Sequence, residues 1–248
     1  NTQNDDFVLW GWDAGSAAAT ASTDGQYTPS AQWINATAGF SMALTEYDST
    51  NAVKTIGTGL NTPVEFAMVK NIDIADNWRC YHKDLSVPNE RYLRLNSSSS
   101  EITSSMWSTS NTTFGINGAG LVGVGDNQDL LAYMFTSIPG FSKFGKYVGT
   151  NAAGNFIHTG FDVKWLMVRS RGEDGWVIND KGRDFNGQYG VDATLTASTD
   201  GAEYTSSSLN VFLLSNGFQL NSATHNGTNT TYVYAAFAAH PLKTARAQ

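Results

Sequence analysis

The sequence predicts an all-β protein made of two tandem β-sandwich or jelly-roll repeats that pack against each other. Aromatic residues make up 12% and charged residues 15% of the 248 residues. Ser, Thr, Asn and Gly are abundant, and these residues suit turns and strand edges rather than helices. Similar motifs recur along the chain at separations of roughly 100 residues. Short apolar runs alternate with turn signals such as Asn216-Gly217, a pattern typical of sandwiches and jelly rolls.

The duplication is visible as an ordered series of matching motifs. The separations drift only by loop-sized insertions, so a repeated unit explains them better than chance does. The matching segments are 39–41 and 140–142, 58–59 and 159–160, 64–70 and 163–169, Trp78 and Trp176, 101–105 and 203–207, 114–117 and 218–221, and 131–135 and 233–237.

Three segments follow from this duplication. Residues 1–38 are expected to be the closing strand of a preceding repeat, at 5–12, followed by a linker; residues 39–138 form the first repeat and residues 139–248 the second. The chain would then be the C-terminal part of a longer repetitive protein, although an unrelated N-terminal strand is the alternative. Only residues 136–139 separate the two repeats, so we expect them to pack together rather than swing freely.

The second repeat shows its expected strands most clearly, and no segment has convincing helical periodicity with caps. The strand around Trp165 is apolar on both faces, which is typical of a strand covered on both sides. The cover would be the other repeat or a neighbouring chain. Strands are predicted at 141–149, 155–161, 163–170, 175–180, 193–198, 208–214, 217–221 and 230–238.

Charge and cysteine content exclude several classes of partner. The net charge is −7 and no Lys/Arg cluster occurs, which argues against nucleic acid and an anionic membrane surface. No apolar run approaches the length of a spanning helix. The single cysteine, Cys80, cannot form an internal disulfide and is expected to be a buried, inert thiol.

The motifs that could carry chemistry all have a plainer interpretation, so we predict no catalytic residue, no metal site and no cofactor. Residues 118–123 match G-x-G-x-x-G, but they lie between two predicted strands rather than between a strand and a helix. Residues 73–77 and 126–129 could supply oxygen ligands to calcium, and we interpret them as polar turns. Glu101 and Glu203 align between the repeats, where hydrogen bonding to nearby backbone or hydroxyl groups is the expected role.

Aromatic side chains in loop-like or strand-edge positions are the best candidates for a sugar-binding site. Ring faces stack on the apolar faces of sugars, while neighbouring polar groups bind the hydroxyls. The other tryptophans, Trp78, Trp165, Trp176 and the pair Trp10 and Trp12, are expected to pack in the interior. The candidate ligand-binding residues are Trp33, Trp107, Tyr189 and Tyr204.

Several segments together resemble a repeat found in tail-fibre-like structural proteins of marine and cyanobacterial phages. They are residues 140–149, 159–161, Trp176 and 215–218, with the C-terminal run 232–246 and the connector-like segments 10–12 and 37–41. The resemblance implies a concanavalin-like or jelly-roll repeat on a virion surface, in a fibre, tail adhesin or capsid decoration. It also implies a homo-oligomer, with a trimer favoured, and it supplies no catalytic residues.

Three functions are therefore compared. The first is attachment of a phage virion to a host cell-surface glycan or protein, with other virion proteins as further partners. The second is a structural or capsid-decoration component without its own ligand. The third, which is least favoured, is a depolymerase acting on capsular polysaccharide. We do not expect an enzyme.

Overall fold

The computed structural model describes residues 8–15, 20–122, 127–183, 193–199, 201–205 and 211–239. Over these residues the chain is an all-β protein built from antiparallel sheets, which confirms the predicted class. Helical structure in this part of the chain is confined to the short 3-10 helix η1, Pro88–Glu90.

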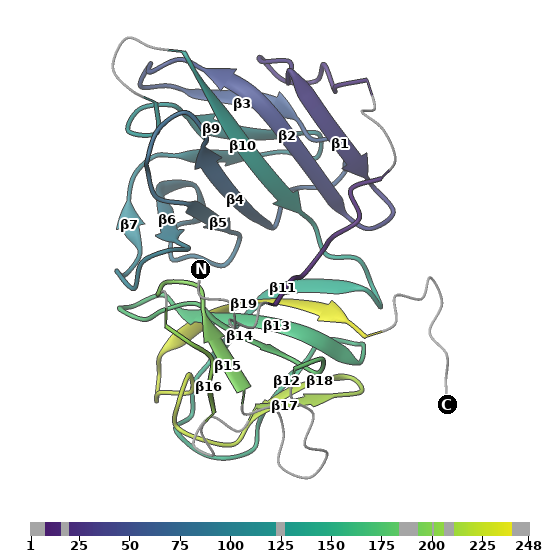
Figure 1. The fold of residues 1–248 in the computed structure, drawn as a ribbon, viewed down its shortest axis with the longest axis vertical. Coiled ribbons are helices and arrows are strands. Elements are labelled where there is room, and N and C mark those ends of the chain that lie inside the picture. The colour runs from purple at the N-terminus through teal and green to yellow at the C-terminus, as the bar shows by residue number, and fades with distance from the viewer. Residues whose placement is uncertain are drawn as a thin grey trace, which may run out of the picture.

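The first half of the chain contains ten strands arranged in two sheets (Figure 1). The seven-stranded sheet has the order β1-β2-β10-β4-β5-β6-β7 and the three-stranded sheet the order β3-β9-β8. The strands are β1 (Ala31–Asn35), β2 (Phe40–Tyr47), β3 (Val53–Gly57), β4 (Phe66–Asn71), β5 (Arg79–His82), β6 (Arg91–Arg94), β7 (Ile102–Thr103), β8 (Trp107–Thr109), β9 (Thr113–Asn117) and β10 (Gln128–Phe135).

The second half contains nine described strands, again in two sheets. The six-stranded sheet has the order β11-β19-β13-β14-β15-β16 and the three-stranded sheet the order β12-β18-β17. All eight predicted strands of this half are present, with ends that differ by a few residues, and the two-residue strand β16 is additional. The strands are β11 (Ser142–Val148), β12 (Asn155–His158), β13 (Val163–Ser170), β14 (Val177–Asp180), β15 (Ala193–Thr196), β16 (Tyr204–Thr205), β17 (Val211–Leu214), β18 (Gly217–Leu220) and β19 (Thr231–Ala238).

Three hydrophobic cores result from the alternation of side chains along the central strands. In β4, Ala67 and Val69 point into the core of the first half, whereas Phe66 belongs to a core between the halves. In β13, Leu166 and Val168 point into the core of the second half, whereas Trp165 and Met167 face the first half. The two-faced apolar pattern of β13 is therefore explained by cover from the other half of the same chain.

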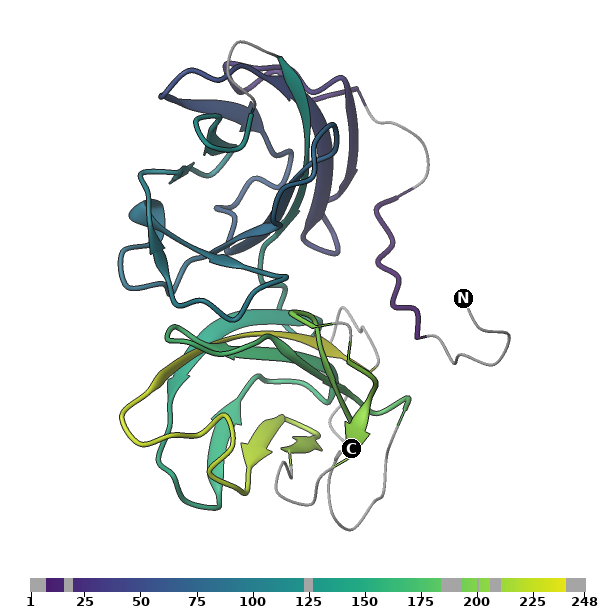
Figure 2. The same cartoon turned by 60° about the vertical axis from the view of Figure 1, so that its left-hand side comes forward.

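The core between the halves, called the junction core below, unites the outer faces of the two large sheets. In both ribbon views the large sheet of the second half faces the first half (Figures 1 and 2). Phe66 and Phe144 stack across the junction with ring centroids 5.6 Å apart. The buried members are Phe40, Phe66, Cys80, Leu85, Leu93 and Phe135 from the first half and Phe144, Trp165, Met167, Trp176, Ile178, Val233, Ala235 and Phe237 from the second.

Arg169 on β13 extends this contact with a set of polar bonds. Its side chain is fully buried, and its guanidinium donates to the backbone carbonyls of Arg94, at 2.5 Å, Ser97, at 2.9 Å, and Ser99. The Trp176 indole N–H donates to the same Arg94 carbonyl at 3.1 Å. One side chain of the second half thus binds three carbonyl oxygens of the first half, one at the end of β6 and two in the loop that follows it.

Cys80 lies within the junction core with 1% of its surface exposed. Burial raises the pKa of its thiol to about 12, because the thiolate would lose its hydration. The expectation of a buried thiol is confirmed.

His82 on β5 makes a second polar contact between the halves. It is fully buried, its Nδ1 accepts a hydrogen bond from the Asp84 N–H, and its Nε2 lies 3.1 Å from the Tyr234 carbonyl oxygen. Because Nδ1 accepts, the neutral ring carries its proton on Nε2 and donates it to Tyr234. Burial, the largest cause, lowers the pKa of His82 from 6.5 to about 4.

Acidification is therefore expected to weaken the protein through His82. The unfolded chain takes up the proton near pH 6.5 and the folded chain only near pH 4, so the stabilisation is complete above pH 6.5 and is lost as the pH falls through this window. The total loss should be about 3 kcal/mol. Urea unfolding of wild type and His82→Gln at pH 7.5, 5.5 and 4 measures it. The variant should show the flatter pH dependence, and parallel curves would contradict the assignment.

The N-terminal segment differs from the expected closing strand. Over its described part, residues 8–15, it forms no strand and crosses the side of the junction instead. Trp10 and Trp12 both pack edge-on against Trp165, at 6.3 and 5.5 Å. The Trp10 indole N–H also donates to Asp180 at 3.2 Å. Side-chain burial against the junction core, rather than a backbone ladder, holds this segment in place, and the expectation that the tryptophan pair packs is confirmed.

Candidate functional site

The three predicted ligand-binding aromatics that the structure describes are not brought together. Trp33 is half-buried on β1 and Tyr204 is 41% exposed on β16, so these two side chains belong to different sheets. Tyr189 lies outside the described residues. In the described structure these aromatic side chains therefore do not form one surface on which a sugar could stack.

Trp107 is a correction to the predicted site. It is only 2% exposed, it stacks on Phe114 at 5.5 Å, and its indole N–H donates to the Arg91 carbonyl at 2.9 Å. The pairing of β8 with β9 turns this ring into the core of the first half. A buried ring of this kind cannot stack on a ligand from solvent.

Two other tryptophans behave as expected and one only partly so. Trp165 and Trp176 are 8% and 0% exposed and belong to the junction core. Trp78 is half-buried and lies against Tyr133, with ring centroids 6.0 Å apart.

A polar hollow lies beside the end of β2 in the first half, and sequence reasoning did not identify it. This polar cleft has a volume of about 420 Å³ and is lined by Tyr27, Thr28, Ser30, Glu46, Asp48 and Asn127. Strand alternation explains its acids: Tyr47 at the end of β2 points into the core, so Glu46 and Asp48 on either side of it point outward. The signal in the sequence that could have identified the cleft is Glu46-Tyr47-Asp48, two acids on either side of a core tyrosine at a strand end.

Asp48 is held as a carboxylate by its neighbours. It accepts hydrogen bonds from the Tyr27 hydroxyl at 2.9 Å, from the Thr50 N–H at 3.1 Å and from the Thr50 hydroxyl. The Thr50 hydroxyl bond, the largest cause, and the Tyr27 bond hold the pKa of Asp48 below its usual value. Burial and the same carboxylate raise the pKa of Tyr27. Asp48 is therefore an acceptor at neutral pH and is unsuited to donate a proton as a general acid.

The cleft presents the groups that recognise sugars. Its two carboxylates accept hydrogen bonds, the hydroxyls of Thr28 and Ser30 can donate or accept, and the Asn127 amide can do both. The Tyr27 ring is fixed edge-on against Tyr47, with centroids 5.0 Å apart. A preorganised set of acceptors beside a fixed ring is suited to binding vicinal hydroxyl groups.

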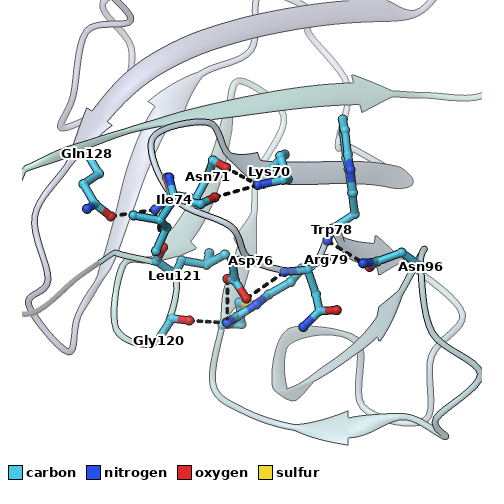
Figure 3. A network of polar contacts seen from close by, with 12 residues as sticks. Lys70, Asn71, Ile74, Asp76, Trp78, Arg79, Asn96, Gly120, Leu121 and Gln128 are labelled. Atoms are coloured by element: carbon cyan, nitrogen blue, oxygen red, sulfur yellow. Dashed lines mark hydrogen bonds and ion pairs between the residues drawn. The ribbon is translucent and has the colours of Figure 1, made fainter.

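Of the segments considered as calcium ligands, Asp126 lies outside the described residues, and the described residues 73–77 and 127–129 take part in an internal polar network (Figure 3). Asp76 pairs with Arg79 at 3.4 Å, and Arg79 also donates to the Gly120 carbonyl. Asp73 accepts from the Asp129 N–H at 2.7 Å, so the two loops are hydrogen-bonded to each other. Within the described ranges, no group of three or more His, Cys, Asp and Glu side chains is arranged to hold a metal ion.

The glycine-rich segment at 118–123 belongs to the same network over its described part. The Leu121 carbonyl accepts from Asn71 at 2.5 Å, and Gly120 adopts a φ of +77°. The residues between β9 and Val122 contain no helix. The backbone carbonyls here bind side chains of the protein itself, so this turn lacks the helix N-terminus that a pyrophosphate needs.

Glu101 and Glu203 also have protein partners. Glu101 accepts from the Ser86 N–H at 3.1 Å and from its hydroxyl, as expected for a structural acid. It also lies 3.7 Å from Arg171 of the second half. Glu203 pairs with Arg183, which the sequence did not predict.

Comparisons with known proteins give one match. The family described as "Domain of unknown function (DUF7483)" matches residues 1–241. Neither a curated protein nor a solved structure matches the chain. Among the helices of the described residues, none has the length and apolar character to cross a membrane.

Proposed function

This chain belongs to the DUF7483 family, whose function is unknown, and we propose that it is a non-catalytic attachment module of a phage virion surface protein. In this proposal the polar cleft binds a glycan on the host cell. The observation that carries it is the cleft itself, with two outward carboxylates, hydroxyl groups and a fixed tyrosine ring. The phage origin comes from the resemblance of the repeat motifs, which also favours a trimeric fibre.

The finer description of the fold is part of the same proposal. Each half would be one copy of a jelly-roll or concanavalin-like sandwich, with residues 39–138 and 139–248 as tandem repeats. Support comes from the strand orders, because β2-β10-β4-β5-β6-β7 and β11-β19-β13-β14-β15-β16 follow the same connections. The small sheets β3-β9-β8 and β12-β18-β17 correspond in the same way.

Loss of the two outward carboxylates should weaken glycan binding. The double variant Glu46→Gln and Asp48→Asn keeps the shape of the cleft but removes both charged acceptors, and hydrogen bonds to charged groups contribute about 1.5–3 kcal/mol each. We expect at least about a tenfold loss of affinity for a glycan selected on an array of host-type surface polysaccharides. Competition of the soluble protein with virions for adsorption to host cells tests the same step.

A matched control is Glu90→Gln, which removes one exposed carboxylate on η1, away from the cleft lining. It should bind and compete like wild type. Equal binding by the double variant and wild type would exclude the cleft as the site. Failure of the wild-type protein to bind any glycan and to compete for adsorption would exclude the attachment function.

The junction core favours a second function, a structural virion component without its own ligand. Fourteen buried residues from both halves form one continuous core, which would make the pair a stiff spacer. Removal of the protein from the virion separates the two functions. Unchanged adsorption and infectivity would support the spacer, and lost adsorption would support attachment.

A further inference from the structure

A second hollow lies beside the junction and shares no lining residue with the polar cleft. It has a volume of about 280 Å³ and is enclosed by the N-terminal segment and both halves of the chain. This aromatic pocket is lined by Gly11, Trp12, Asp13, Ala38, Phe40, Phe135, Phe141, Phe237 and Ala238.

Five aromatic rings make up most of the walls of this pocket. Trp12 meets Phe135 at 6.2 Å and 68°, and it meets Phe237 at 5.5 Å and 61°. Phe141 meets Phe237 at 6.1 Å and 74°. Phe40 and Phe135, in contrast, are stacked at 4.6 Å and 17°, so the five rings present faces in more than one direction, as in an aromatic cage. Phe40, Phe135 and Phe237 are buried, whereas Trp12 and Phe141 are half-buried and have ring surface left to contact a ligand.

The charge of the lining is also one-sided. Among the described lining residues Asp13 is the only charged one, and its carboxylate accepts a hydrogen bond from the Gly15 N–H at 2.8 Å. No lysine or arginine is among the described residues that line the pocket. The nearby Trp10 ring already makes a cation–π contact, because the Arg183 guanidinium lies 5.6 Å from the centroid of this ring.

From these observations we propose that the aromatic pocket binds a small quaternary ammonium group, such as the head of choline. The fit follows from three contrasts. An anion would be repelled by the negative faces of the aromatic rings and by the Asp13 carboxylate. A primary ammonium is strongly hydrated and would need several acceptors, which the ring walls do not supply. A methylated ammonium is weakly hydrated, presents an apolar surface to the rings and keeps a full positive charge for Asp13.

Titration of the ¹⁵N-labelled full chain with choline chloride tests this site. The indole N–H signal of Trp12, assigned with the Trp12→Phe variant, should shift and saturate. The neutral isostere 3,3-dimethylbutan-1-ol has the same shape without the charge, and it should bind about tenfold more weakly. Sodium chloride at matched concentration should leave the signal unchanged.

Variants separate recognition from folding. Trp12→Leu should lose about tenfold in choline affinity, measured by calorimetry, whereas Trp12→Phe keeps a ring and should stay within about threefold of wild type. Asp13→Asn should weaken choline severalfold, and Glu173→Gln, an exposed acid outside the pocket, should not. Equal affinity for choline and its isostere would overturn the proposal. So would absence of saturation up to about 100 mM, or unchanged affinity in both Trp12→Leu and Asp13→Asn.

Because the pocket and the polar cleft have no residue in common, the two proposals fail independently. Loss of choline binding in Trp12→Leu with intact glycan binding would support the aromatic pocket alone. If the double variant of Glu46 and Asp48 loses glycan binding but binds choline unchanged, the two sites are separate.

Discussion

Replacement of Arg169 by alanine should destabilise the protein by about 3–5 kcal/mol. The side chain is fully buried and supplies donors to three carbonyl oxygens of the first half. Truncation removes the Arg169 donors from these part-buried carbonyls, of which only that of Arg94 has the Trp176 indole N–H as a second donor. It also removes the guanidinium beside the Trp176 ring, now 5.9 Å from the ring centroid. Urea unfolding followed by near-ultraviolet circular dichroism measures the loss as a lower midpoint.

Two further variants show how much the Arg169 guanidinium contributes to stability. Arg169→Lys keeps the charge but cannot reach several carbonyls with one fork, so it should recover only part of the loss. Lys70→Ala is the matched control, because Lys70 occupies the aligned position in the first half and donates to the carbonyls of Asn71 and Ile74 in its own half. It should cost about 1 kcal/mol or less. An Arg169→Ala midpoint equal to that of Lys70→Ala would refute the bridging role.

The second large effect is expected for Trp176→Ala, with a loss of about 3–5 kcal/mol. Trp176 is fully buried, packs edge-on against Phe66 at 6.1 Å and donates to the Arg94 carbonyl. Its removal leaves a cavity in the junction core as well as a weakened hydrogen-bond set. Denaturant unfolding of the variant, with intrinsic fluorescence of the remaining tryptophans, provides the measurement.

Two comparisons test the cause of this loss. Tyr204→Ala removes an exposed ring from β16 and should change the stability by about 0.5 kcal/mol or less. The double variant with Arg169→Ala should lose less than the sum of the two single losses, because both side chains serve the Arg94 carbonyl. Strict additivity would argue that the two groups act separately.

The strands and the interior tryptophans could be predicted from sequence because their signals are local. Alternation and Asn-Gly turns mark β17 and β18, and the apolar run around Trp165 fits β13. Trp107 was placed wrongly because a three-residue strand in a Ser/Thr-rich segment shows no clear alternation. Its burial is decided by the pairing with β9, which is a contact between strands rather than a property of the segment.

The sites were harder to predict because they join segments that are distant in the chain. The polar cleft brings Tyr27 of the connector next to Asp48 and Asn127. The aromatic pocket joins Trp12 to Phe237, and the Arg169 contacts span between 70 and 75 residues. Composition indicated binding by aromatic and polar groups, but only the packing of the two halves decides which of these groups meet.

The junction core has a consequence for how larger assemblies could be built. Phe66 and Phe135 on one large sheet and Trp165 and Phe237 on the other occupy each other's outer faces. When two bodies bind through the same kind of face, both faces are used and no further body can bind there. A head-to-tail contact instead leaves one face free, to which another body can bind. The two halves therefore saturate one another, and a third body of this kind must attach through strand edges or loop ends.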